Sequence, residues 1–155
     1  MIVNELEKAV VKQYMNLLLL ADPEKQAIEQ YINQCHVYLL SDEHQSQSLA
    51  IAAVETLSDT EVELKNIAVH PLYRRKGLGT YLMTWLFAKY QNMTMYVGTS
   101  DTESTLKFYY RLGFKDYDIR QNFFISQYEQ PIYDNGKLLI DMKILKKGFI
   151  KCVLC

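Results

Sequence analysis

The sequence predicts an α/β fold with a mixed β-sheet, in which some strands pair in parallel and others antiparallel. Two observations predict it. Hydrophobic residues first recur at helical spacing and then at alternate positions, and after residue 70 the two patterns take turns. The resulting order of helices (α) and strands (β), αα-βββ-α-β-α-β-β, is typical of α/β chains. With 155 residues and no repeat or Gly/Ser/Pro linker, the chain is predicted to be one domain, residues 1–155.

Two helices are predicted near the N-terminus. Residues 5–20 carry leucine, valine and tyrosine side chains at helical spacing and form the first helix. Asp22 suits an N-cap, Pro23 suits a first turn and Glu24 favours the positive end of a helix, so a second helix is expected here. Its apolar stripe consists of Ile28, Tyr31, Ile32 and Cys35.

Alternating hydrophobic residues then predict three strands. They are residues 36–40, 47–56 and 62–69, with a polar turn at 41–46. Helical spacing returns after Gly79. The remaining elements are a strand at 93–97, a helix at 102–112, a short strand at 114–117 and a last strand at 138–146.

The composition excludes several classes of protein. Seventeen basic and eighteen acidic residues leave a formal charge of −1, which argues against a nucleic-acid binder that relies on a strong global field. The strongly apolar stretch of residues 17–21 is far below the ~20 residues of a membrane span, and no secretory signal is recognisable. Three cysteines make no disulfide framework. We therefore expect a cytoplasmic protein that binds no membrane, no nucleic acid and no metal.

A basic turn that contains glycines, between a strand and a helix, is the segment most indicative of function. The first turn of a helix presents unpaired N–H groups and the positive end of the helix dipole, which together bind anions. Gly77 and Gly79 would let a ligand approach the backbone closely, and three basic residues add charge around it. The turn is therefore predicted to bind a phosphate or pyrophosphate. The three basic residues are Arg74, Arg75 and Lys76.

Three alternatives compete with this interpretation. A P-loop requires G-x-x-x-x-G-K-[ST], and the chain has no such run. A Rossmann turn requires G-x-G-x-x-G/A, but Leu82 stands where the third small residue should be. A solvated basic turn that merely begins a helix fits the helix-start pattern as well as an anion site does.

Two motifs resemble those of the GCN5-related N-acetyltransferase (GNAT) family. Arg74-x-x-Gly77-x-Gly79 resembles the family's acetyl-CoA signature, R/Q-x-x-G-x-G/A. Further along, residues 108–114 (Phe-Tyr-Tyr-Arg-Leu-Gly-Phe) resemble the F-Y-x-x-x-G-F segment that closes the family's fourth helix. The resemblance covers residues 47–117 well and the flanking segments more loosely. It implies the family's fold in its small bacterial branch, with two N-terminal helices and a mostly antiparallel central sheet splayed at the cofactor site.

The resemblance also implies an activity. The family transfers an acetyl group from acetyl-CoA to an amine by direct attack in a ternary complex, without an acyl-enzyme. The acceptor would be the primary amine of a small molecule or a peptide, and the protein a monomer or homodimer. A domain of the same fold that binds acetyl-CoA without turning it over, as a sensor or interaction module, is the alternative.

The resemblance further implies which residues hold acetyl-CoA. The main chain of Ile67, Ala68 and Val69 would pair with the pantetheine arm, and one N–H group would face the thioester oxygen. Thr102 stands where the family often has asparagine and Thr105 where it often has alanine, so the side-chain contact at Thr102 is expected to differ. The pyrophosphate would lie against the backbone of Arg75, Lys76, Gly77, Leu78, Gly79 and Thr80, beside Arg74.

Two residues are implied to carry the proton transfers. Tyr109 matches the family's general-acid tyrosine, and a phenol of pKa ~10 can protonate a thiolate whose conjugate acid has a pKa of ~8.5. Glu63 precedes Val69 by six residues, as the family's glutamate base does, although a β-bulge in this strand would reverse the face on which it lies. Tyr109 could instead only pack in the core, and the adjacent Tyr110 could be the acid. Glu63, like its neighbour Glu61, could be a solvated strand carboxylate.

Two further segments bear on the substrate and the C-terminus. The aromatic and acidic segment 118–137 could wall a site for a cationic amine, or could be a surface loop packed over the core. The tail 147–155 contains Cys152-x-x-Cys155. This single pair of cysteines is too little for a zinc site, and it fits a prenylation motif poorly. We favour a loosely ordered tail, or one that packs on a partner. The candidate wall residues in 118–137 are Phe124, Tyr128, Glu129, Tyr133 and Asp134.

Overall fold

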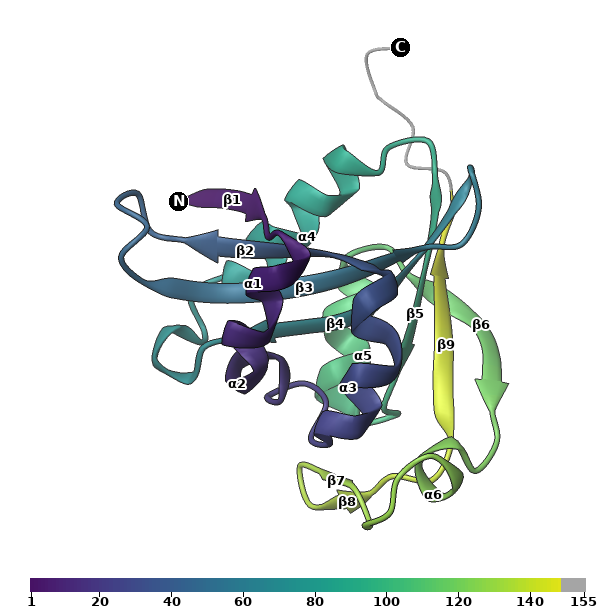
Figure 1. The fold of residues 1–155 in the computed structure, drawn as a ribbon. Coiled ribbons are helices and arrows are strands. Elements are labelled where there is room, and N and C mark those ends of the chain that lie inside the picture. Colours follow the sequence, from purple (N-terminus) through teal and green to yellow (C-terminus); the bar gives the residue numbers. More distant parts are fainter. Residues whose placement is uncertain (149–155) are drawn as a thin grey trace.

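A seven-stranded sheet dominates the computed structural model, which describes residues 1–148 (Figure 1). The strands lie in the order β1-β2-β3-β4-β5-β9-β6. Within the described residues, β4 and β5 pair in parallel and the other neighbours pair antiparallel, which confirms the predicted mixed sheet. The bounds are β1 Ile2–Glu5, β2 Cys35–Ser41, β3 Ser48–Thr56, β4 Glu61–Val69, β5 Thr94–Thr99, β6 Lys115–Arg120 and β9 Met142–Lys147.

Helices cover both faces of this sheet. Figure 1 shows α1, α2 and α3 in front of it and α5 behind it. Among the described residues, no helix is long and apolar enough to cross a membrane. The bounds are α1 Lys8–Val11, α2 Met15–Leu18, α3 Lys25–Tyr31, α4 Leu78–Lys89, α5 Glu103–Arg111 and α6 Phe123–Ser126, with 3-10 turns at Lys12–Tyr14, Ile32–Gln34 and Pro71–Tyr73.

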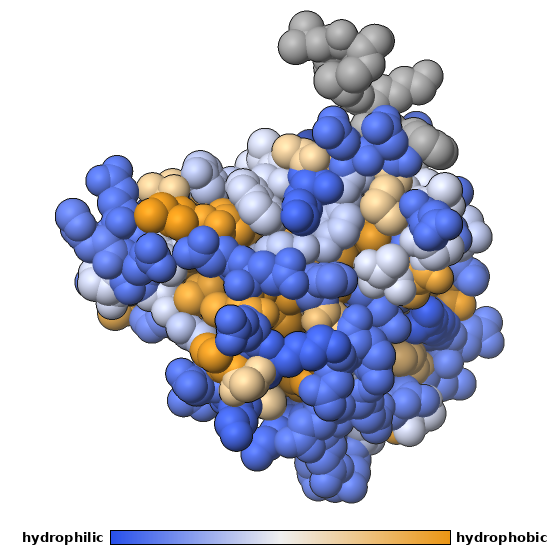
Figure 2. Space-filling view, turned by 45° about the horizontal axis from the view of Figure 1, so that its top comes forward, coloured by the Kyte–Doolittle hydropathy of each residue, from blue (hydrophilic) through white to orange (hydrophobic). Residues whose placement is uncertain are grey.

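Two hydrophobic clusters, one on each face of the sheet, form the core. The central strand β3 contributes to both, because Ala52 and Val54 face α4 and α5 whereas Ile51 and Ala53 face α1–α3. Burial on both faces explains why β3 is apolar along nearly its whole length. Figure 2 shows that hydrophilic side chains cover most of one outer face of the molecule, with hydrophobic surface in small areas between them.

The N-terminal part differs from the sequence prediction in three respects. Residues 2–5 form the edge strand β1, which pairs with β2 and was predicted as part of no strand. The predicted helix 5–20 is two short helices separated by a 3-10 turn. Cys35 begins β2 instead of ending the second helix.

The predicted last strand also divides. Residues 137–138 belong to a small hairpin made of β7 (Tyr133–Asp134) and β8 (Lys137–Leu138), and β9 begins only at Met142. Asn135 and Gly136 form the hairpin turn with φ of 49° and 77°, a conformation that these residue types accept readily. The alternating pattern over 138–146 therefore spans two elements.

A β-bulge at Lys65 determines which β4 side chains face which layer. Ala53 of β3 pairs with Asn66 and Val54 pairs with Leu64, so Lys65 has no partner in β3. Because of the extra residue, even-numbered positions before the bulge and odd-numbered positions after it face α4 and α5. Glu63 therefore lies on the opposite face, toward α3, together with Asn66.

Strands β4 and β5 separate just beyond this bulge. Their parallel pairing runs from Glu61 opposite Thr94 to Leu64 opposite Val97 and then stops. Figure 1 shows the two strands diverging from this point. The side of β4 that faces β5 therefore has no strand partner within the described residues along 66–69.

Candidate active site

The basic turn, residues 74–77, leads into α4 with the geometry of an anion site. Gly77 is the N-cap with φ of 75°, and Arg75 also has a positive φ of 64°. The first hydrogen bond of the helix runs from the N–H of Tyr81 to the carbonyl of Gly77, at 2.9 Å. Three N–H groups of the first turn therefore have no partner within the described residues. They belong to Leu78, Gly79 and Thr80.

Positive charge surrounds these N–H groups. Arg74, Arg75 and Lys76 are exposed, and none of them pairs with a carboxylate of the described residues. Arg74 instead donates a hydrogen bond from Nε to the carbonyl of Val69, at 3.3 Å. Because these cations lack counterions, the donor set fits a pyrophosphate.

The two glycines of the turn have different roles. Gly77 needs its positive φ, and a Cβ atom placed there would meet no atom within 4 Å. A Cβ atom on Gly79 would lie 3.3 Å from the ring of Phe108 and 3.7 Å from Val69. The sequence analysis gave both glycines the same purpose, but Gly79 allows α4 to pack closely against α5.

The gap between β4 and β5 is a cavity of about 390 Å³, here called the split cavity. Ile67 lines it, whereas Ala68 is buried against the α1–α3 layer and Val69 packs toward α4 and α5. Asn66 and Ile67, at the start of the unpaired stretch of β4, therefore border a space large enough for a narrow ligand. Its wall includes Asn66, Ile67, Val97, Thr105 and Tyr109.

Tyr109 lies on the wall of the split cavity. Its side chain is only 6% exposed and packs edge-on against Phe108 and Phe114, with ring centroids 5.1 and 5.5 Å away. Burial raises its pKa, so the hydroxyl keeps its proton at neutral pH. Tyr110 is 40% exposed and donates its hydroxyl hydrogen to Asp116 on the surface, so the structure separates the two neighbouring tyrosines.

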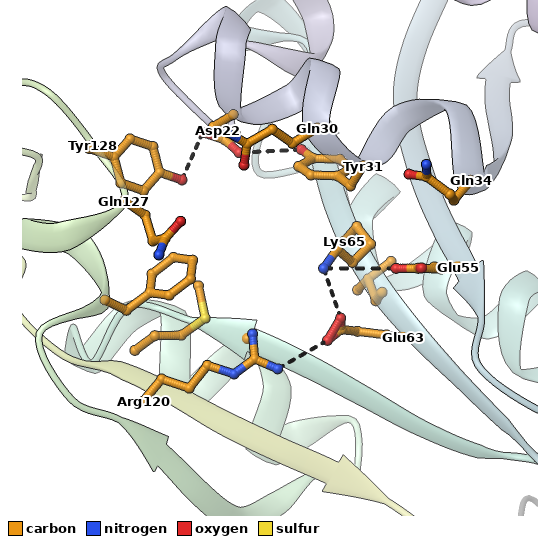
Figure 3. A pocket seen from close by; sticks show the side chains of 15 residues that line it. Asp22, Gln30, Tyr31, Gln34, Glu55, Glu63, Lys65, Arg120, Gln127 and Tyr128 are labelled. Carbon is orange, nitrogen blue, oxygen red and sulfur yellow. Dashed lines mark hydrogen bonds and ion pairs between the residues drawn. The ribbon is translucent and has the colours of Figure 1, made fainter.

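A second cavity of about 310 Å³ adjoins the split cavity, and we call it the ion-pair cavity. The two cavities share wall residues, so a molecule in one can reach a molecule in the other. Figure 3 shows its charged and aromatic side chains facing one another from several elements. The shared residues are Asp22, Leu64, Lys65, Gly98, Tyr128 and Met142.

Glu63 is the centre of the ion pairs that give this cavity its name. The ammonium of Lys65 lies 3.0 Å from one carboxylate oxygen of Glu63, and the guanidinium of Arg120 lies 3.8 Å from the other. Lys65 also lies 3.9 Å from Glu55. Glu61 lines neither cavity and accepts a hydrogen bond from the hydroxyl of Tyr96, so the two strand carboxylates have different surroundings.

Asp22 lies on the other side of the ion-pair cavity (Figure 3). Its carboxylate accepts hydrogen bonds from the hydroxyls of Tyr128, at 3.0 Å, and Tyr31, at 3.3 Å. Burial raises the pKa of Asp22 against the effect of these hydrogen bonds. The predicted N-cap role is wrong, because α3 begins at Lys25 with Glu24 as its N-cap.

Asp134 fastens the β7–β8 hairpin to the start of α5. It accepts hydrogen bonds from the hydroxyls of Ser100, at 2.8 Å, of Thr102, and of Thr105, at 3.3 Å. Burial opposes its ionisation, but these hydrogen bonds outweigh burial and lower the pKa of Asp134. The hydroxyl of Thr102 is thus engaged within the protein, and the carboxylate of Asp134 does not stand free to face an amine.

The other predicted wall residues divide between the cavities and the surface. Phe124 and Tyr133 line the split cavity, and Tyr128 lines both cavities. Glu129 is exposed and lines neither. No local motif marks the unpredicted wall residues of the ion-pair cavity, which include four charged residues and one tyrosine: Asp22, Glu55, Lys65, Arg120 and Tyr31.

Two other expectations concern metal and the tail. In residues 1–148, no group of three or more His, Cys, Asp or Glu side chains is placed to hold a metal ion. The interpretations of Cys152 and Cys155 lie outside the described residues, as does most of the predicted tail.

Comparison with known proteins identifies the class of protein that this fold and site define. The model of the acetyltransferase (GNAT) domain matches residues 33–116, and the chain belongs to this family. It is an acetyl-CoA-dependent N-acetyltransferase. The matched residues contain the basic turn and the whole motif around Tyr109, and the predicted family is confirmed.

Three bacterial proteins show how far the similarity extends. The uncharacterized N-acetyltransferase YvbK of Bacillus subtilis (strain 168) is 31% identical over 147 residues, 89% of this chain and 90% of that protein. The structure of a GNAT family acetyltransferase from Elizabethkingia anophelis with acetyl-CoA bound has a TM-score of 0.85 and 29% identity, over 96% of this chain and 97% of that chain. A Bacillus subtilis acetyltransferase in complex with CoA has a TM-score of 0.84 and 26% identity, over 95% and 97%. These similarities confirm the predicted fold.

Proposed function

We propose that this enzyme transfers the acetyl group of acetyl-CoA directly to a primary amine in a ternary complex, with Tyr109 as general acid and Glu63 as general base. One observation carries the proposal. Tyr109 and Glu63 line two cavities that share six wall residues, so donor and acceptor can meet between them. Acetyl-CoA would occupy the split cavity, and the amine would enter the ion-pair cavity.

The basic turn and the free side of β4 would hold acetyl-CoA. The pyrophosphate would accept hydrogen bonds from the unpaired N–H groups at the start of α4, with Arg74, Arg75 and Lys76 supplying positive charge. The pantetheine arm would pair with the backbone of residues 67–69, where β5 has separated from β4. An N–H group that faces the thioester oxygen would stabilise the transition state by about 2.7–4 kcal/mol.

Two proton transfers complete the reaction. Acetyl-CoA supplies the acetyl group as a thioester, and the attacking amine must be neutral. Glu63 would accept the proton of the amine, directly or through water, from its position in the ion-pair cavity. Tyr109 would donate its proton to the departing thiolate, and its place on the wall of the split cavity supports this role.

A thiol-release assay over a panel of amines tests the proposed function. We expect some primary amines to accelerate CoA release from acetyl-CoA, with one acetylated product per thiol by mass spectrometry. Acetyl-CoA that binds tightly without release by any amine would contradict the proposal and would indicate a binding module. Mass spectrometry would also detect a different acyl group.

We further propose a cytoplasmic location for this enzyme, acting as a monomer or homodimer. Within residues 1–148 the one cysteine, Cys35, is a free thiol, as is usual in the reducing cytosol, and this supports the location.

A further inference from the structure

Asp22 differs from the other carboxylates of the ion-pair cavity. Glu63 pairs with Lys65 and Arg120, and Glu55 lies beside Lys65. Asp22 has no cationic partner within the described residues. Its carboxylate accepts hydrogen bonds from the hydroxyls of two tyrosines and from the backbone N–H of Glu24. A partly buried carboxylate without a counterion is costly, and a ligand that brings a positive charge would offset this cost.

The surroundings of Asp22 suit an ammonium group. Tyr31 comes from α3 and Tyr128 follows α6, and their hydroxyls converge on the carboxylate (Figure 3). Tyr128 is held in place by stacking on Phe124, with ring centroids 5.9 Å apart. Lys65 already lies over the ring of Tyr31, 5.5 Å from its centroid, so cation–π attraction to a ligand would come from the ring of Tyr128. Glu24, close enough to raise the pKa of Asp22, makes this end of the cavity more negative.

We propose that Asp22, Tyr31 and Tyr128 hold a second ammonium group of the acceptor while its first amine reacts beside Glu63, so that the acceptor is a diamine or polyamine. This inference rests on the proposed function, because Glu63 marks the place of the reacting amine. Figure 3 shows Asp22 and Glu63 on different sides of the cavity, as two amines on one chain require.

The charge balance of the cavity supports a cationic acceptor over a zwitterionic one. Its wall carries three carboxylates against two cations, a net charge of −1. A diamine whose attacking amine has lost its proton keeps one positive charge, which equals and opposes that of the wall. An amino acid whose attacking amine has lost its proton would keep only the charge of its carboxylate, and would add a negative charge to the cavity. The three carboxylates are Asp22, Glu55 and Glu63, and the two cations are Lys65 and Arg120.

Calorimetric titration of the CoA-bound enzyme with compounds of equal chain length tests the proposal. Three compounds with a five-carbon chain differ only at the end opposite the amine. Cadaverine ends in an ammonium group, n-pentylamine in a methyl group and δ-aminovalerate in a carboxylate group. Putrescine and its monoamine and amino-acid counterparts repeat the comparison at four carbons. We expect the diamine to bind about tenfold more tightly than the monoamine, and the amino acid to bind most weakly. Equal affinities for diamine and monoamine, or tightest binding of the amino acid, would overturn the inference.

Two variants locate the interaction. Asp22→Asn keeps an acceptor for the tyrosine hydroxyls but removes the charge, and should weaken diamine binding to the level of the monoamine without changing monoamine binding. Glu129 is exposed and is adjacent to Tyr128 in the sequence, so Glu129→Gln removes a surface charge and should change the binding of neither the diamine nor the monoamine. An equal loss for both amines in Asp22→Asn would mean a structural role and would overturn the inference. The wild-type comparison needs no substitution, so it stands even if Asp22→Asn fails to fold.

Turnover of the same compounds separates this inference from the proposed function. Acetylation of monoamines and diamines with equal kcat/KM would overturn the diamine inference while acetyl transfer to amines stands. Diamine binding that depends on Asp22, without acetylation of any amine, would overturn the proposed function while the ammonium site stands.

Discussion

The split cavity and the ion-pair cavity adjoin each other, but they are built in different ways. The split cavity and the turn beside it depend on backbone: unpaired N–H groups at the start of α4, a positive φ at Gly77 and the unpaired side of β4. The ion-pair cavity depends on side chains. Asp22 and Tyr128, which share a hydrogen bond in its wall, lie 106 residues apart in the sequence.

This difference suggests how one fold accommodates many acceptors. Backbone groups offer the same hydrogen bonds whatever their side chains, so a site built from them recognises one constant ligand, acetyl-CoA. Side chains can differ on the same backbone, so a site built from them, such as the ion-pair cavity, can differ in specificity between proteins of one fold. The comparison predicts that substitutions on the two sides alter different kinetic constants.

The largest effect is expected at Tyr109, on the wall of the split cavity. Tyr109→Phe removes the proton donor but keeps the ring that packs against Phe108 and Phe114. We expect kcat to fall roughly 10²–10⁴-fold with unchanged affinity for acetyl-CoA, measured by steady-state kinetics and calorimetry. Tyr110→Phe is the matched control and should leave kcat unchanged. Full activity in Tyr109→Phe would exclude Tyr109 as the acid.

A smaller loss is expected at Glu63, on the acceptor side. Glu63→Gln should lower kcat/KM for the amine about 100-fold at neutral pH and leave the KM for acetyl-CoA unchanged. Because a more alkaline solution itself deprotonates the amine, the loss should shrink as pH rises, and a pH profile of kcat/KM measures this. Glu61→Gln, whose carboxylate only meets Tyr96, should behave as wild type. A loss independent of pH would argue against a base.

The smallest effect is expected at Gly77, on the donor side. Gly77 and Gly136 have φ of 75° and 77°, and a Cβ atom at either position would meet no atom within 4 Å. Because a residue with a Cβ atom adopts a positive φ only at a cost, Gly77→Ala and Gly136→Ala should each lower the free energy of unfolding by about 1–2 kcal/mol. Only Gly77→Ala should raise the KM for acetyl-CoA, about fivefold, because it disturbs the anion site. Equal KM values in the two variants would contradict a role for this backbone in binding.

Most of the fold and the donor side could be predicted from the sequence, because their determinants are local. The alternation of β3 and the order of the elements indicate the sheet, and the spacing of Arg74, Gly77 and Gly79 indicates a helix start that binds an anion. Gly79 shows the limit of such patterns. Gly79 packs against the ring of Phe108. The sequence does not distinguish a glycine that leaves room for a ligand from one that leaves room for a neighbouring side chain.

Elsewhere tertiary contacts overrode the local pattern. Thr102 matched a position for contact with acetyl-CoA, but its hydroxyl is bound to Asp134 of the β7–β8 hairpin, in the segment 118–137 that was expected to wall an amine site or to form a surface loop. Asp22 followed by a proline resembled a helix cap, but the carboxylate is held by two tyrosines instead. In both cases a hydrogen bond with a residue distant in the sequence replaces the role that the local pattern predicted.

The sequence by itself determined the family, the mixed sheet, the anion-binding turn and Tyr109 as the candidate acid, because each depends on contiguous residues or on backbone conformation. Only the tertiary structure decided the acceptor side. The bulge at Lys65 turned Glu63 toward α3, and folding brought Asp22 and Arg120 to the same cavity. Electrostatic fit among side chains depends on distances across the fold, and the sequence does not display those distances.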